Sequence, residues 1–171
     1  PQTITIQKAY NNDYFSGKLI AYYLGLSQHY YESLGLNPDK LKFRELGDDE
    51  KSFYAKEAWD TEYNASFGTV EITANNYRTN HDLKQHSRVS KTDLKITEDG
   101  EKFYPHIWEM SMGVDRLLLS ILDEAYTEEK KRTLLKLKPR LAPITVAVFP
   151  LMKKDGLAEK AQEVNELLQQ D

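Results

Sequence analysis

The sequence predicts an α+β fold in which helices back an antiparallel sheet, followed by the beginning of a separate α/β unit. Three observations lead to this prediction. Apolar residues recur at helical spacing over 13–36, and alternating residues on both sides of Ser66 predict a hairpin. Residues 144–149 form one continuous apolar run, which is typical of a strand buried on both faces.

The first half of the chain predicts two helices, a strand and the hairpin. A helix over 13–36 is followed by a short strand over 41–45, and the acids at 48–50 predict a second helix that runs to about residue 59. The hairpin then pairs 60–65 with 67–74. One face of its second strand is expected to carry Phe67, Thr69, Glu71 and Thr73.

The second half of the chain alternates between helical and strand patterns. Residues 79–90 predict a polar helix, 104–109 a strand, 112–126 an apolar helix, and 131–138 an alternating segment with Leu135 and Leu137 inward. The buried face of the apolar helix is expected to hold Leu117, Leu118, Ile121, Leu122 and Ala125.

The hydrophobic pattern changes after Pro143, where the apolar strand predicted over 144–149 precedes a terminal helix over 157–170. This strand and helix form a single β-α unit, and about 30 residues cannot bury a stable core alone. The sequence therefore predicts one domain over 1–141 and a second, truncated domain over 142–171.

Composition excludes several classes of function. The 171 residues contain no cysteine, so a disulfide scaffold and thiolate chemistry are excluded. No secretory signal is visible, and the uncharged stretch over 144–152 is too short to span a membrane. The four histidines lack metal-ligand spacing. At a net charge of −4, binding to nucleic acid would need a local basic patch.

Two stretches carry candidate chemistry. In Pro105–Arg116 a strand brings Glu109 and Ser111 to one face, and Arg116 enters beside them at the start of the apolar helix. A salt bridge between Glu109 and Arg116 would explain the same residues structurally. In the second stretch Glu71 lies in mid-strand and needs a cation, which could be Arg78, Arg116 or a metal, unless this sheet face is simply solvated.

Four ordered blocks from about residue 12 onward resemble the dimeric class II glycyl-tRNA synthetase family. Residues 105–116 resemble its third class II motif, PH-x-x-E-x-S-x-G-x-x-R. Residues 41–62 are similar to its L-R-F-R-E, H-Y-A and W-D-x-E stretches, and 71–83 to its E-x-x-G-I-A-x-R-x-x-Y-D-L strand. Residues 146–155 resemble the opening of its anticodon-binding domain.

The resemblance implies a class II catalytic domain over 1–141, with the third motif at 105–126, and the start of the anticodon-binding domain over 142–171. It implies a glycine–tRNA ligase that uses ATP and Mg²⁺ to activate glycine and transfer it to tRNA-Gly. The whole protein is expected to be a cytoplasmic homodimer without membrane segments.

The resemblance also implies roles for individual residues. Arg116 would contact the ATP γ-phosphate, and Glu71 would help to hold Mg²⁺ on the triphosphate. Glu109 would face the glycine ammonium group and Arg78 the carboxylate. The ATP site would comprise Glu71, Ile72, Gly113, Val114, Asp115 and Arg116, and the glycine site Arg78, Glu109, Met110, Ser111, Met112 and Gly113.

The chain departs from the family pattern at several points. Ala74, His81 and Met110 stand where the family has Gly, Tyr and Pro. The first and second class II motifs are missing, and Arg44 only mimics the second, so the chain alone is expected to be inactive. Two alternatives are a non-catalytic synthetase-like accessory protein and a class II enzyme for another amino acid, such as threonine or proline.

Overall fold

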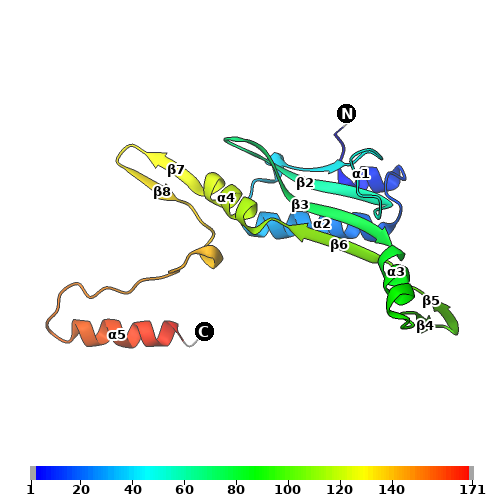
Figure 1. The fold of residues 1–171 in the computed structure, drawn as a ribbon. Helices are drawn as coiled ribbons and strands as arrows, with labels where there is room; N and C mark the ends of the chain where they lie inside the picture. The colour runs from blue at the N-terminus through cyan, green and yellow to red at the C-terminus, as the bar shows by residue number, and fades with distance from the viewer. Residues whose placement is uncertain (1–2, 170–171) are drawn as a thin grey trace. The chain divides into compact units, whose positions relative to one another are not determined.

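The computed structural model in Figure 1 describes residues 3–169. These residues fall into two compact units, one ending at Lys136 and one beginning at Leu137. All strands of the described residues lie in the first unit, and their pairings are antiparallel. The α+β prediction is therefore confirmed at the level of its elements.

A four-stranded sheet with the order β1-β2-β3-β6 forms the centre of the first unit. Its strands are β1 (Leu41–Glu45), β2 (Glu57–Ala65), β3 (Gly68–Thr79) and β6 (Ile107–Met112). The β2-β3 hairpin turns at residues 66–67, and Gly68 follows with a φ of 124°. Glycine adopts this backbone conformation without a steric penalty, so the turn can be tight.

A β-bulge interrupts the alternation of β3. Thr61 lies opposite Thr73 whereas Glu62 lies opposite Glu71, so Ile72 is the extra residue. Ile72 and Thr73 are both buried, but Glu71 is exposed. The prediction that Glu71 and Thr73 share a face is therefore wrong, because the extra residue reverses the alternation between them.

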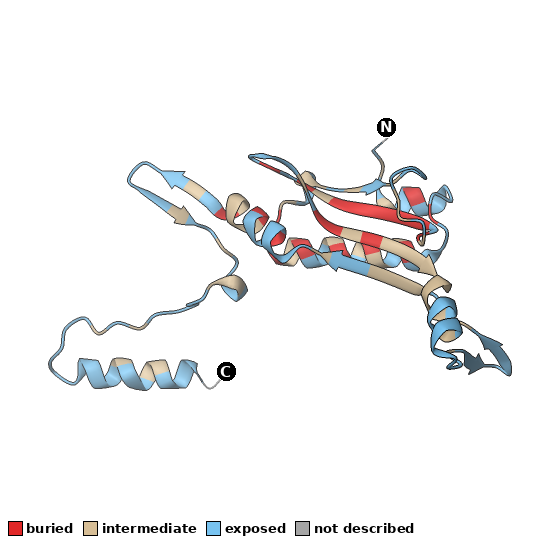
Figure 2. Ribbon diagram, viewed as in Figure 1, coloured by how far each residue is buried: buried red, intermediate tan, exposed pale blue. Residues whose placement is uncertain are grey.

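Helix α2 (Lys18–Ser33) covers one face of the sheet, and α1 (Ile6–Asn11) packs beside it. Leu24 and Tyr31 of α2 are fully buried, and the hydroxyl of Tyr31 is hydrogen-bonded to that of Thr73. Figure 2 shows the buried positions gathered along β2, β3 and α2. One apolar cluster of buried residues comprises Ala9, Phe15, Ile20, Leu24 and Trp59.

A buried carboxylate joins the segment between α1 and α2 to the sheet. Glu57 accepts hydrogen bonds from the backbone amide of Ser16 at 2.7 Å, from the Ser16 hydroxyl, and from Trp59 Nε1 at 2.7 Å. These donors satisfy a charge that would otherwise be costly to bury.

Helix α4 (Val114–Ala125) follows β6 directly and is tied to the β2-β3 hairpin by polar contacts. Asp123 accepts a hydrogen bond from the backbone amide of Ser66 at 2.9 Å. Glu124 accepts from the hydroxyl of Tyr63 and pairs with Lys40, of the short helix η1 (Pro38–Lys40), at 2.7 Å. The carboxylates at the end of α4 therefore orient the helix against the sheet.

The remaining elements are short. In the first unit, α3 (His81–Ser90) follows β3, β4 (Ile96–Glu98) pairs with β5 (Glu101–Phe103), and β7 (Tyr126–Glu129) pairs with β8 (Arg132–Leu135). The second unit contains η2 (Pro139–Leu141) and α5 (Leu157–Leu168).

Most predicted elements are confirmed with shifted ends. Helices α2, α3, α4 and α5 and strands β1, β2, β3, β6 and β8 correspond to predicted segments. The prediction ended α5 at residue 170, which lies outside the described residues. Helix α1, the β4-β5 hairpin and β7 were not predicted.

The helix predicted from 48 to about 59 is wrong. Residues 48–50 form a turn, and β2 begins at Glu57. The carboxylate of Glu50 accepts a hydrogen bond from the backbone amide of Gly47 and pairs with Arg44, which closes the turn. Trp59 then pairs with Glu45 of β1, so ladder hydrogen bonds replace helical ones.

The buried strand predicted over 144–149 is also wrong. These residues have no regular structure, and the side chains of Ile144 and Phe149 are 75% and 84% exposed. A strand buried on both faces needs neighbouring strands and covering helices. The described residues provide no strand to pair with it.

Two predicted core positions are also exposed. Leu118 of α4 is 53% exposed and Leu135 of β8 is 48% exposed, whereas Leu117 and Ala125 are buried as predicted. Helix α4 contacts the sheet along a narrower stripe than its sequence suggested. Among the described residues, no helix combines the length and the apolar character needed to cross a membrane.

Replacing Leu24 with alanine is expected to lower the free energy of unfolding by about 2–5 kcal/mol, because Leu24 is fully buried and a cavity would remain. Leu26→Ala is the matched control on the same helix, where the side chain is 50% exposed, and it should cost less than about 1 kcal/mol. Urea unfolding of both variants measures the difference. Equal losses would contradict the packing described for α2.

Candidate functional site

The face of the sheet opposite α2 carries a set of polar side chains. The pairing of β1, β2, β3 and β6 lines up Arg44, Asp60, Ala74 and Ser111 across the four strands. The adjacent residues Thr73 and Met110 contact Tyr31 and Ser27 of α2. Because neighbouring strand residues point to opposite faces, the row from Arg44 to Ser111 faces away from α2. We call this side of the sheet the polar face.

At one edge of the polar face, Arg44 binds three carboxylates. Its guanidinium group lies 2.8 Å from Glu62, 2.9 Å from Glu50 and 3.1 Å from Asp60. Hydrogen bonds to Glu50 and Glu62 raise the pKa of Arg44. This arginine is thus engaged by its own sheet and by the turn before β2.

At the far end of β3, Arg78 is held on several sides. It makes two hydrogen bonds to Asp82, at 2.6 and 2.8 Å, and one to Glu109 at 2.5 Å. Its guanidinium carbon lies 3.8 Å from the centre of the Tyr54 ring, a cation–π arrangement. The side chain of Arg78 is only 20% exposed. Tyr54 and Asp82 therefore fix the orientation in which Arg78 meets Glu109.

These contacts also set the protonation of the group. Hydrogen bonds from Arg78 hold the pKa of Asp82 below its usual value, and hydrogen bonds to Asp82 and Glu109 raise the pKa of Arg78. Each side chain therefore stabilises the charged form of the other.

A second ion pair lies where β6 passes into α4. Arg116 Nη1 is 3.4 Å from the Glu71 carboxylate and donates a hydrogen bond to the Glu71 carbonyl at 3.1 Å. Both side chains are well exposed, at 57% and 43%. The backbone amide of Gly113 bonds the Ile72 carbonyl, and a β-carbon on Gly113 would lie 3.3 Å from Cδ of Arg116. Glycine therefore lets the Arg116 side chain lie against the strand end.

The two ion pairs differ from the structural alternative for residues 105–116, which was a salt bridge between Glu109 and Arg116. Glu109 pairs with Arg78, not with Arg116, and Glu71 takes Arg116 as its cation. Ala74 and Ser111 lie between the two pairs along β3 and β6. A small ligand on this part of the polar face would therefore have a cation and a carboxylate at each end.

Asp60 adds a carboxylate near Glu71. Burial and then the negative charge of Glu71 raise the pKa of Asp60, although Arg44 opposes the shift. The described residues contain no group of three or more metal-ligating side chains arranged around one point. One or two carboxylates, with phosphates completing the shell, are what Mg²⁺ ordinarily uses beside a nucleotide, and Glu71 with Asp60 nearby fits that donor set.

The other predicted site residues are distributed as follows. Ile72 is buried, and Val114 and Asp115 lie exposed on the first turn of α4. The Sδ atom of Met110 lies 3.9 Å from the Ser27 hydroxyl, on the α2 side of the sheet. Met110 can therefore contribute only its backbone to the polar face, and alternation gives Met112 the same orientation.

Sequence reasoning missed Tyr54, Asp60 and Asp82 as members of the site. Two signals were available. Asp60 follows the alternation of β2, and Asp82 lies four residues after Arg78 at the start of α3, where the two side chains can meet. The position of Tyr54 in an irregular segment has no sequence signal.

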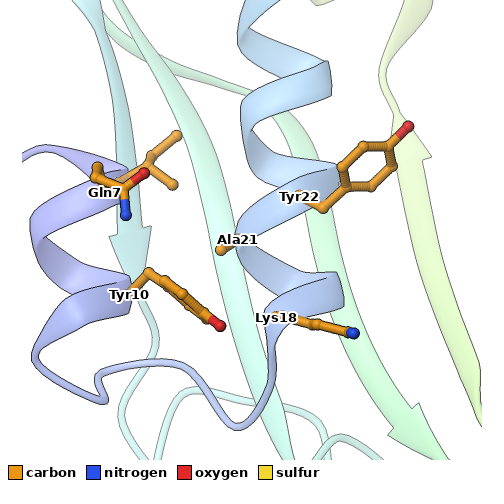
Figure 3. A pocket seen from close by; sticks show the side chains of 6 residues that line it. Gln7, Tyr10, Lys18, Ala21 and Tyr22 are labelled. Carbon is orange, nitrogen blue, oxygen red and sulfur yellow. The ribbon is translucent and has the colours of Figure 1, made fainter.

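A pocket of about 330 Å³ lies on the helical side, between α1 and α2. Figure 3 shows its side chains, which come from these two helices. Lys18 is its only charged residue, alongside Ile6, Gln7, Tyr10, Ala21 and Tyr22. The pocket has no pair of opposite charges comparable to those of the polar face, so it is a weaker candidate for chemistry.

Comparison with known proteins gives consistent relatives, although no family model matches the chain. It is 42% identical to a glycine–tRNA ligase of Treponema denticola, over 83% of this chain and 34% of the relative. It is 41% identical to that of Clostridium tetani, over 86% and 33%, and 44% identical to that of Caldanaerobacter subterraneus, over 70% and 27%. The chain thus spans about a third of the length of these curated relatives.

Replacing Asp82 with asparagine is expected to reduce the pH dependence of stability. The folded pKa of Asp82 is lowered, so its stabilising effect is present above the ordinary carboxyl pKa and is lost as the pH falls through the lowered value. At pH 7 the variant should lose about 1 kcal/mol, and this difference should shrink toward zero at the acid end of the range. Unfolding free energies from pH 7 to pH 2 measure this.

Asp49→Asn is the control for that comparison, because Asp49 is exposed and has no cationic partner among residues 3–169. It should leave the pH profile close to that of the parent chain. A profile for Asp82→Asn that runs parallel to the parent over the whole range would show that Arg78 and Asp82 do not stabilise each other in solution.

Proposed function

The chain belongs to the glycine–tRNA ligase family, and we propose that it forms the part of such a ligase that binds glycine and ATP. The activity is ATP-dependent activation of glycine and its transfer to tRNA-Gly. The observation that supports this most directly is the pair of ion pairs, Arg78–Glu109 and Arg116–Glu71, on either side of Ala74 and Ser111.

The Arg78–Glu109 pair suits the two ends of an amino acid. The ammonium group of glycine would take the place of Arg78 beside Glu109, and its carboxylate would take the place of Glu109 beside Arg78. Ser111 lies on the same face as Glu109 and would line this pocket, together with the backbone of Met110, Met112 and Gly113. Since glycine has no side chain, charge at both ends and limited space select it.

The Arg116–Glu71 pair suits the triphosphate of ATP. Arg116 is exposed and would contact the γ-phosphate and lie over the adenine, while the backbone of Ile72 and the first turn of α4, with Val114 and Asp115, would border the nucleotide. Glu71 would hold Mg²⁺ against the phosphates. Bound Mg²⁺ would neutralise phosphate charge as the glycine carboxylate oxygen bonds to the α-phosphorus and pyrophosphate departs.

The residues of this chain thus contribute orientation and charge. An in-line attack of a carboxylate on a phosphate needs the two groups held in position and their charges compensated, with little proton transfer. This requirement agrees with a site of arginines, carboxylates and a hydroxyl. We propose that the 171 residues alone do not aminoacylate, because the second class II motif is not among them.

The broader assignments belong to the same proposal. We assign 1–141 to a class II synthetase-like catalytic domain with its third motif at 105–126, and 142–171 to the opening of an anticodon-binding domain. We further propose that the native protein works in the cytoplasm as a homodimer. A scaffold has no need of several polar side chains gathered at one place, so their presence favours an enzyme over a non-catalytic accessory protein. These side chains are Glu71, Arg78, Glu109, Ser111 and Arg116.

The native polypeptide that carries this sequence is expected to exchange pyrophosphate into ATP only when glycine is present. Arg116→Ala should reduce kcat/KM for ATP about 10²- to 10³-fold, because a positioned charge on the triphosphate would be lost. Arg88→Ala, which removes an exposed arginine of α3, is the control and should leave exchange unchanged. A native polypeptide that binds tRNA but shows no exchange would favour the accessory-protein alternative.

The amino-acid preference can be tested at Ala74, whose methyl group lies between Asp60 and Ser111 on the polar face. Ala74→Gly removes that methyl group and should raise the rate of alanine-dependent exchange, relative to glycine, about tenfold. Val70→Ala, which also shortens a side chain of β3 but outside this row, should leave the ratio unchanged. Faster exchange with threonine or proline than with glycine in the parent enzyme would reject the glycine assignment.

A further inference from the structure

Positive charge in this acidic chain is concentrated in one segment. The net charge is −4, yet residues 130–140 contain six basic residues and no acidic one. The first part of this segment belongs to the β7-β8 hairpin, whose strands are joined by a two-residue turn at Lys130 and Lys131. We call residues 126–136, which hold four basic residues and the two acids Glu128 and Glu129, the basic hairpin.

The cations of the basic hairpin are only partly compensated. Glu129 is shared by Arg132, at 2.8 Å, and Lys136, at 3.9 Å. Lys130 and Lys131 are exposed, and nothing in the described part of the chain forms an ion pair with them. The tip therefore presents two uncompensated charges, and Arg132 beside them remains 70% exposed.

The hairpin holds these charges at a defined place. Four residue pairs, from Tyr126–Leu135 to Glu129–Arg132, form its ladder. The backbone amide of Lys136 bonds the carbonyl of Ala125 at 2.7 Å, which fastens the base of the hairpin to the end of α4. Cations held in this way lose less conformational entropy on binding than those of a flexible tail.

The partner that fits this surface is a chain of phosphates. Exposed single ion pairs contribute little, so the tip would hold one free phosphate only weakly. A nucleic-acid backbone offers successive phosphates, and each neutralised phosphate adds counterion release. Within helix α4, the ten residues from Arg116 to Ala125 span about 15 Å up to the base of the hairpin, which corresponds to on the order of four phosphates along one strand.

We propose that the basic hairpin is an RNA-binding surface, in which Lys130 and Lys131 contact the phosphate backbone of the tRNA whose end reaches the polar face. This inference rests on the proposed function, because the ligase activity is what makes tRNA the relevant polyanion. The contact is with backbone and not with bases, so it contributes affinity without sequence preference.

The test reverses the two charges in the native polypeptide. The double variant Lys130→Glu/Lys131→Glu should bind a tRNA-Gly transcript at least tenfold more weakly at 100 mM salt. The slope of log affinity against log salt should become less steep by about 2, as expected for two lost phosphate contacts. Glycine-dependent pyrophosphate exchange, which needs no tRNA, should stay at the parent rate.

Lys84→Glu/Lys91→Glu is the matched control, because it reverses two other exposed lysines of the first unit and changes the net charge equally. It should retain most of the tRNA affinity. Unchanged affinity and slope in the hairpin variant, or an equal loss in the control, would overturn the inference. So would competition by polyglutamate as effective as that by tRNA at equal charge. Absence of exchange in the parent enzyme would instead reject the proposed function.

Discussion

The pairing of β3 with β2 on one side and with β6 on the other determines which side chains of this chain are available for chemistry. Helix α2 covers one face, so Thr73 and Asn75 turn inward, while their neighbours Ala74 and Asn76 face away from it. The bulge at Ile72 then reverses which side chains of β3 face inward and which face outward. Without the bulge, Glu71 would share the inward face with Thr73, where an ionised carboxylate would be costly. One extra residue thus brings Glu71 to Arg116.

The ion pairs of the polar face also explain how its charged side chains are stabilised when no ligand is bound. Arg78 and Glu109 compensate each other at 2.5 Å, so neither is left as an uncompensated charge in a half-buried position. A zwitterion carries the same two charges and can take both places at once, exchanging one ion pair for two. A lone amine or a lone carboxylate can take only one place and would leave the other charge without its partner. Such a site discriminates by requiring both ends of the ligand.

The sequence was most informative where local pattern and tertiary contacts agree. The period of α2, the turn of the β2-β3 hairpin and the apolar stripe of α4 all follow from short-range rules. The candidate residues Glu71, Arg78, Glu109 and Arg116 came from motifs on β3, on β6 and at the start of α4. The helix predicted over 48–59 did not form, because Glu50 pairs with Arg44 and Trp59 pairs with Glu45 of β1. The strand predicted over 144–149 did not form because it has no partner strand among the described residues. A strand needs neighbours that its own sequence cannot provide. The bulge at Ile72 and the Tyr54 contact have no local signal.

Charge balance across the polar face leads to a final constraint on any nucleotide bound there. Asp60, Glu62, Glu71 and Glu109 all lie on this face, and Arg44 and Arg78 are already engaged by carboxylates. Arg116 is the cation that remains most exposed, and it is one charge beside a triphosphate. Near Glu71 and Asp60 a polyphosphate would meet like charge. Burial is the main cause of the raised pKa of Asp60, and the negative charge of Glu71 raises it further. A divalent cation between the carboxylates and the phosphates removes this repulsion. The carboxylates beside Arg116 are therefore a reason for such a site to take its nucleotide together with Mg²⁺.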